Sequence, residues 1–181
     1  MSFSRSLVAA AFGLFAASVA FANPNVGGAP MYENKNIVEN AVNSKDHTTL
    51  VAAVKAAGLV DTLMGAGPFT VFAPVNSAFA KLPNGTVDTL LKPENKDTLT
   101  AVLTYHVVAG KLTAEELMKD VKQGGGKATL TTVEGATLQV VEKGRKLEII
   151  DAKGDVGVIT IPDVLQSNGV IHVVDTVMLP K

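Results

Sequence analysis

The stretch Phe69–Pro83, FTVFAPVNSAFAKLP, contains a strand pattern followed at once by a helix pattern. Its first five residues, FTVFA, form a short apolar run that is typical of a buried strand. The strand ends at Pro74, because proline cannot donate a backbone hydrogen bond. Asn76 stands where a side-chain cap would begin a short helix, which Pro83 then stops. The segment predicts a buried strand that turns directly into a helix of one or two turns.

A second stretch, Asn168–Pro180, reads NGVIHVVDTVMLP and predicts a glycine turn that leads into a long buried strand. The two runs are the most apolar strand candidates in the chain, so pairing them centrally would bury the most surface. Each buried Val, Ile or Phe side chain contributes roughly 1.5–3 kcal/mol. The residues predicted to lie in the core are Phe72, Phe79, Val102, Ile171 and Val173. His172 is predicted to be a hydrogen-bonded core histidine, and Asn76 and His106 are expected to make structural hydrogen bonds.

The remaining pattern changes from helical to strand-like along the chain. Capping-box patterns at Asn36–Glu39 and Thr113–Glu116 indicate helix starts, and helical stripes of apolar residues fill much of the first half. From Lys127 onward the apolar residues alternate in short runs that are separated by Gly, Asp and Lys. Helices first and strands later, without regular βαβ alternation, favour an α+β fold in one domain over residues 36–181.

The amino terminus is typical of a secretory signal peptide. Arg5 is its only charge, an apolar run follows from Leu7 to Phe21, and Ala20-Phe21-Ala22 offers a cleavage site. We expect residues 1–22 to be removed and residues 23–35, rich in Gly, Pro and Asn, to be a flexible leader. An uncleaved membrane anchor is the alternative, although the run is shorter than the ~20 residues that span a bilayer. The protein is therefore expected to be exported, to the periplasm or the cell exterior.

Composition excludes several classes of function. The formal net charge is −1, which gives no broad electrostatic reason to bind nucleic acid or an anionic membrane. The chain contains no cysteine, which rules out disulfides, thiol catalysis and iron–sulfur ligation. No later stretch is apolar enough to serve as a transmembrane anchor.

Motifs for catalysis and metal binding are incomplete. The GGGKAT stretch of Gly124–Thr129 lacks the spacing of a phosphate-binding loop, and a GxSxG motif is absent. Asp151 and Asp155 are too few oxygen ligands for a calcium loop. The histidines form no HExxH or HxH motif; they are His47, His106 and His172. We expect no enzyme activity, metal or cofactor, and a hydrolase would need one of these histidines to meet a serine or carboxylate in a cleft.

Three elements together resemble the fasciclin domain family. Phe69–Pro83 and Asn168–Pro180 are similar to its two conserved boxes, and Leu103–Leu112, LTYHVVAGKL, is similar to the Tyr-His element between them. The resemblance extends from about Asn36 to Pro180. It implies a wedge of two packed short sheets with several helices, mostly in the amino-terminal half. It also implies a secreted or surface-attached protein concerned with adhesion and matrix contacts, as in single-domain exported bacterial members, and no enzymatic role.

The resemblance implies two candidate contact sites, because family members from animals use a Tyr-His element and a Pro-Asp-hydrophobe segment in receptor binding. The matching residues in this chain are Tyr105 and His106, and Pro162, Asp163, Val164 and Leu165. Ile161 stands where those relatives carry an acidic residue, which is a departure from the receptor-binding pattern. Packing, backbone hydrogen bonding and a turn at Asp163 are the structural alternatives.

The expected function is a non-catalytic binding module that supports adhesion or envelope association. Its partner would be a surface or matrix protein or a polysaccharide. The alternative is a soluble carrier of a lipid or small hydrophobic ligand. An enclosed apolar cavity would favour the carrier, and a flat exposed patch with aliphatic side chains would favour the adhesion module.

Overall fold

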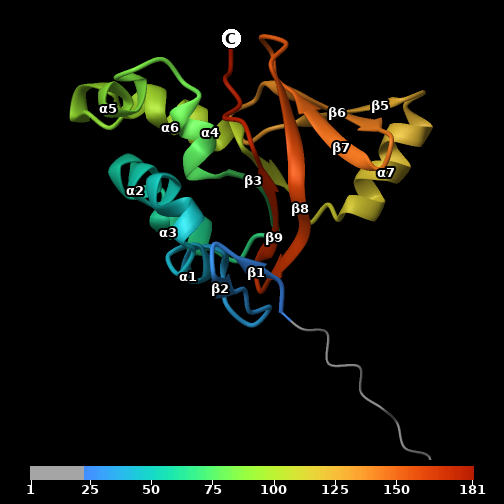
Figure 1. The fold of residues 1–181 in the computed structure, drawn as a ribbon, viewed down its shortest axis with the longest axis horizontal. Coiled ribbons are helices and arrows are strands. Elements are labelled where there is room, and N and C mark those ends of the chain that lie inside the picture. The colour runs from blue at the N-terminus through green and yellow to red at the C-terminus, as the bar shows by residue number, and fades with distance from the viewer. Residues whose placement is uncertain (1–22) are drawn as a thin grey trace, which may run out of the picture.

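The computed structural model describes residues 23–181, which form a strongly bent sheet with helices on one side and at one end (Figure 1). The helices are α1 (Ile37–Ala41), α2 (Thr48–Ala57), α3 (Val60–Met64), α4 (Asn76–Ala80), α5 (Thr86–Leu90), α6 (Lys96–Tyr105) and α7 (Ala114–Gln123), with 3-10 turns η1 (Lys45–His47) and η2 (Pro93–Asn95). The strands are β1 (Asn25–Val26), β2 (Ala29–Pro30), β3 (Phe69–Pro74), β4 (Val107–Ala109), β5 (Lys127–Thr131), β6 (Thr137–Lys143), β7 (Lys146–Ile150), β8 (Val156–Gln166) and β9 (Gly169–Val174). The α+β class and the concentration of helices in the first half are confirmed.

The predicted central strand pair is present. β3 and β9 are parallel neighbours, in register from Phe69 opposite Gly169 to Pro74 opposite Val174. All six residues of β9 are buried. The five residues predicted for the core are all buried; they are Phe72, Phe79, Val102, Ile171 and Val173.

The strands form one continuous seven-stranded order, β4-β3-β9-β8-β7-β6-β5, rather than two separate short sheets. The wedge arises because β8 pairs with β7 at its start and with β9 further on, with register shifts between Ile159 and Val164. Such bulges bend a strand and increase its twist. The two ends of the sheet approach each other, because Val133 donates its backbone N–H to the Val107 carbonyl at 2.8 Å. The sheet is therefore nearly closed.

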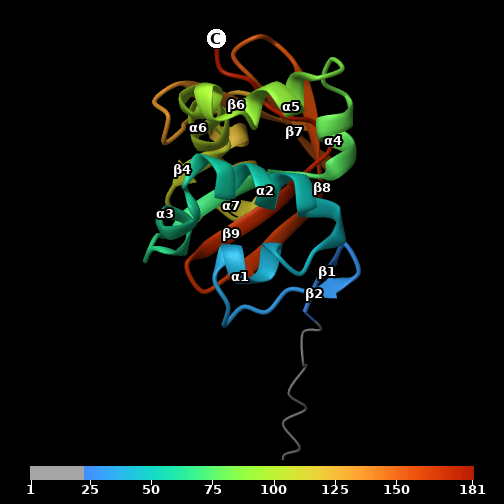
Figure 2. The same ribbon diagram turned by 90° about the vertical axis from the view of Figure 1, so that its left-hand side faces the viewer.

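Two hydrophobic cores share the β3–β9 pair. The helical core lies between this pair and α1, α2, α3 and α6, and includes Leu50, Leu103 and Ile171. The sheet core lies among β5–β8 and α7, and includes Leu117 and Leu138. Because successive strand side chains point to opposite faces, β3 supplies both cores from alternate positions. Figure 2 shows α1 and α2 in front of β9 on the helical side.

The segment expected to be a flexible leader, residues 23–35, is instead ordered against the domain. β1 and β2 form a hairpin, and Val26 and Met31 are only 3% and 2% exposed. The Met31 N–H donates to the Pro24 carbonyl, and the Lys45 N–H donates to the Gly27 carbonyl. The Gly residues here make a tight turn with positive φ, which is a structural use of glycine that composition alone does not distinguish from flexibility. The predicted signal peptide, residues 1–22, lies outside the described residues.

Asn76 makes structural hydrogen bonds as expected, but it does not cap its own helix. Its Oδ1 accepts from the Thr49 N–H at 3.0 Å and the Thr48 hydroxyl at 3.2 Å, and its Nδ2 donates to the Lys45 carbonyl at 2.8 Å. The side chain thus caps the start of α2 and joins it to β3–α4. The capping boxes expected at Asn36 and Thr113 are both confirmed.

Substituting Met31 tests whether the hairpin contributes to stability. Met31→Ala should lower the free energy of unfolding by about 2 kcal/mol, because a buried side chain is replaced by a partial void. Tyr32→Ala is the control, since Tyr32 is 38% exposed and its loss should cost much less. Urea unfolding measures both variants. Equal, negligible effects would support a flexible leader instead.

Candidate functional site

Tyr105, expected as a contact residue, is completely buried at 0% exposure. Its hydroxyl donates to the Thr137 carbonyl at 2.7 Å and accepts from the Ala152 N–H at 2.9 Å. These bonds tie the end of α6 to β6 and to the loop after β7. Tyr105 therefore holds the sheet core to the helices and forms no part of the outer surface.

His106 is also inside the molecule, at 2% exposure. Its Nδ1 donates to the Val102 carbonyl at 2.8 Å, and its Nε2 accepts from the Met178 N–H at 2.9 Å. Burial lowers the pKa of His106 to about 4, because the charged ring would be deprived of water. The neutral ring anchors the chain that follows β9, so the expected structural role of His106 is confirmed.

The second candidate segment straddles the β8 bulge and is partly exposed. Pro162 and Asp163 are exposed, Val164 is buried in the helical core, and Leu165 is half-buried. Asp163 adopts a positive φ of 56°. Its Oδ1 accepts from the Ala114 N–H at 2.7 Å, at the amino-terminal end of α7. Asp163 therefore has a structural role, and any contact role of Pro162 and Asp163 stays a prediction.

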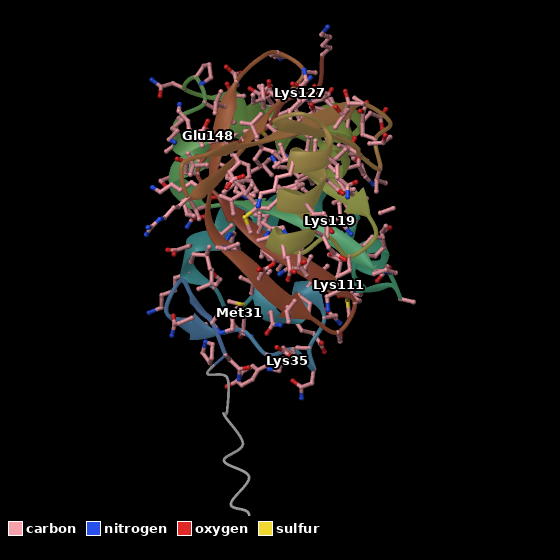
Figure 3. The ribbon with its side chains drawn as sticks, turned by 90° about the vertical axis from the view of Figure 1, so that its right-hand side faces the viewer. Met31, Lys35, Lys111, Lys119, Lys127 and Glu148 are labelled. Carbon is pink, nitrogen blue, oxygen red and sulfur yellow. The ribbon has the colours of Figure 1, made fainter. Side chains whose placement is uncertain are left out.

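Another candidate surface lies on the side of β5–β8 that faces away from the sheet core, which we call the outer face. Alternate residues of these strands point into the sheet core, such as Leu138 and Ile149 at 0% exposure. The intervening residues are exposed or half-buried and lie in register across the four strands. The outer face consists of Lys127, Thr129, Thr131, Thr137, Gln139, Val141, Lys143, Lys146, Glu148, Ile150, Val156, Val158 and Thr160. Figure 3 labels Lys127 and Glu148, two of its charged side chains.

The helical core contains an apolar cavity of about 70 Å³ between α1, α2, α3 and the strands β3, β8 and β9. Its walls are mainly aliphatic, with Leu50, Val54, Val71 and Ile171 among the buried side chains that line it. The structure thus contains both features that distinguish a surface-binding module from a carrier.

Comparison with known proteins identifies the family. The family model described as Fasciclin domain matches residues 45–180. The chain belongs to the fasciclin domain family. Protein sll1483 of the cyanobacterium Synechocystis is 51% identical over 144 residues, which cover 80% of this chain and 73% of that protein. The cell surface glycolipoprotein MPB83 of Mycobacterium bovis is 37% identical over 122 residues, 67% of this chain and 48% of its own.

A solved fasciclin structure has the same fold. The FAS1 domain pair from the insect cell adhesion molecule Fasciclin I superimposes with a TM-score of 0.72, covering 80% of this chain and 51% of that one. The sequence identity is 20%, so this likeness concerns the fold. Within residues 23–181 of this fasciclin domain, no helix is both long and apolar enough to cross a membrane.

Among residues 23–181, one serine–histidine contact bears on whether the protein could be a hydrolase. The Ser44 hydroxyl lies 2.9 Å from His47 Nδ1, and both residues are buried, at 2% and 3% exposure. His47 Nε2 contacts the Ala73 carbonyl at 3.4 Å. Both ring nitrogens thus have structural partners, and Ser44 begins the η1 turn. In the described part of the chain, no three His, Asp or Glu side chains gather closely enough to hold a metal ion.

Acid should destabilise the domain through His106. Its pKa is about 4 in the folded state and about 6.5 when unfolded, so the unfolded chain binds more protons between these values. Stability is complete above pH 6.5 and falls with pH, by about 3 kcal/mol at pH 4. Urea unfolding at pH 7 and pH 4 measures this loss. His106→Gln should be less stable at pH 7 but lose less on acidification; an unchanged pH dependence in the variant would contradict the assignment.

Substitutions of Asp163 test its structural role. Asp163→Ala should lower the free energy of unfolding by about 2 kcal/mol, because α7 loses a hydrogen-bond acceptor and alanine is strained at positive φ. Asp163→Asn should cost far less, because its side-chain oxygen can still accept and asparagine tolerates this backbone conformation. Thermal unfolding compares the two. Equal destabilisation by Ala and Asn would show that the capping bond contributes nothing.

Proposed function

We propose that this fasciclin domain is an exported, non-catalytic binding module that attaches to a protein or polysaccharide of a cell surface or matrix. The outer face of β5–β8 is the proposed contact surface. The observation that carries the proposal is the group of aliphatic side chains left accessible there: Val156 is 48% exposed, and Val141, Ile150 and Val158 are half-buried. Accessible surfaces with apolar side chains among polar ones are typical of protein interaction sites.

The outer face has the composition of a surface for an uncharged or mixed partner. Lys127, Val141, Glu148 and Val158 form one continuous cross-strand row, with Val141 and Glu148 on the two central strands. The outer face as a whole carries Lys127, Lys143 and Lys146 against one carboxylate, Glu148, which pairs with Lys143 at 3.7 Å. The adjacent row ends in Ile150 and Val156. Hydrogen-bonding Thr and Gln side chains lie among the aliphatic ones, which suits a partner that offers hydrogen-bonding groups, such as a protein backbone or sugar hydroxyls.

Relatives support the location outside the cytoplasm. The name of MPB83 describes a cell surface glycolipoprotein, and the insect structure comes from a cell adhesion molecule. The amino-terminal pattern of Arg5 and the apolar run after it favours export of this chain as well. Pro162 and Asp163 are exposed further along β8, beyond its bulge, and form a separate candidate contact site.

A charge placed on the outer face tests the proposal. Val156→Glu should reduce saturable binding of the fluorescently labelled protein to intact cells of its source at least tenfold, because a carboxylate would be buried without a partner. Val42→Glu is the matched control, because Val42 is 49% exposed but lies just after α1 on the helical side. Both variants should keep the thermal midpoint of the parent protein. Equal binding by the two variants would place the contact surface elsewhere.

A further inference from the structure

The helical core is incompletely packed around its cavity. It lies between α2 and the β3–β9 pair, and the side chains that enclose it include Leu50, Val54, Val71 and Ile171. Interiors of proteins are normally packed to crystal density, so an apolar void of this kind loses contacts that a ligand could restore. Genuinely apolar cavities stay dry and admit hydrocarbon.

The polar groups on the cavity wall are already used. His47 contacts Ser44 and the Ala73 carbonyl through its two ring nitrogens. His106 contacts the Val102 carbonyl and the Met178 N–H in the same way. No buried side-chain nitrogen or oxygen among the described residues lacks a hydrogen-bond partner. The inner part of the cavity therefore offers nothing to a polar ligand and suits an alkyl group.

The rim of the cavity is different, because three of its lining residues are exposed: Lys55, Thr62 and Val133. The void therefore reaches the surface. Among the described residues that line it, Lys55 is the only one with a charged side chain. The ion pairs found in residues 23–181 involve Lys81 and Lys143, so the Lys55 ammonium has no carboxylate partner there. An anionic group at the rim would complement this charge.

The size of the cavity limits the shape of the occupant. Its volume is about 70 Å³. An engineered apolar cavity of about 150 Å³ admits benzene, so a void of half that size suits the end of a linear chain better than a ring. The remainder of a longer chain would lie along the half-buried Val51, Leu59 and Val60 toward the rim.

We propose that the helical core binds the alkyl end of a monoanionic amphiphile of the fatty-acid class, with its carboxylate beside Lys55. This site is separate from the outer face of β5–β8, because the β3–β9 pair stands between the helical core and the sheet core. The inference does not rest on the proposed surface function.

Calorimetric titration with dodecanoate, below its micellar concentration at pH 7.5, tests the proposal. The purified exported protein should bind it saturably at one site, and more tightly than it binds dodecyltrimethylammonium. Lys55→Ala should weaken dodecanoate binding by about fivefold, the upper range for one exposed ion pair. Lys119→Ala is the matched control and should bind as the parent does, because Lys119 is exposed on α7, which packs on the sheet core rather than on the cavity.

A second variant tests the location of the alkyl chain. Val54→Phe fills the cavity from α2 and should abolish dodecanoate binding, while circular dichroism confirms that the variant is folded. Val54→Leu, a smaller change, should weaken binding less and guards against a folding defect in the Phe variant. The proposal is wrong if the parent protein shows no saturable dodecanoate binding, if the cationic amphiphile binds as tightly, or if the folded Val54→Phe variant keeps the parent affinity.

Discussion

The parallel pairing of β3 with β9 is the constraint on which the rest of the structure depends. Both strands are flanked by further strands and are covered on both faces, so every polar group in them needs a partner inside the protein. The Thr70 hydroxyl donates to the Gly110 carbonyl at 2.7 Å and accepts from the Leu112 N–H at 2.8 Å. His172 contacts the Leu112 carbonyl at 2.7 Å. The central pair thereby fixes the loop that leads from β4 to α7.

The same constraint explains why the three histidines are structural. His47 contacts the β3 carbonyl of Ala73, His172 stacks on Phe72 with ring centroids 5.7 Å apart, and the His106 carbonyl accepts from the Phe72 N–H. Burial lowers the pKa of all three imidazoles. Rings held neutral by desolvation, with both nitrogens in fixed hydrogen bonds, are poorly placed to exchange protons with a substrate. Their contribution is to connect separate segments to β3.

Much of the fold could be predicted from the sequence because its strongest signals are local. The apolar runs at Phe69–Ala73 and Val170–Val174 identify the central strands, and capping boxes identify the starts of α1 and α7. The hairpin before α1 could not be predicted, because its order depends on Met31 and Val26 entering a core built from distant residues. Asn76 was misassigned for a related reason, since the helix it caps precedes it in the chain by many residues.

The candidate site was less predictable, because exposure is a property of the assembled fold. Tyr105 and His106 match a motif, yet their side chains point into the two cores, and the motif contains no signal for that direction. The alternation of apolar and polar residues in β5–β8 predicts that each strand has one buried side and one polar side. It does not predict whether another element of the fold covers the polar side. The cavity is an unfilled space between residues from at least five elements. Its presence depends on how those elements pack, which no sequence pattern predicts.

The buried polar side chains, the outer face and the cavity occupy different parts of the molecule. Within the described residues, every buried polar side chain has a hydrogen-bond partner, and these bonds connect separate segments of the interior. Two regions are accessible to a partner or ligand. One is the outer face of β5–β8 over the sheet core, and the other is the cavity in the helical core. In the functions proposed above, both would bind through contact area. Because the rigid β3–β9 pair separates them, substitutions on the outer face should leave the cavity intact, and the two can be altered independently.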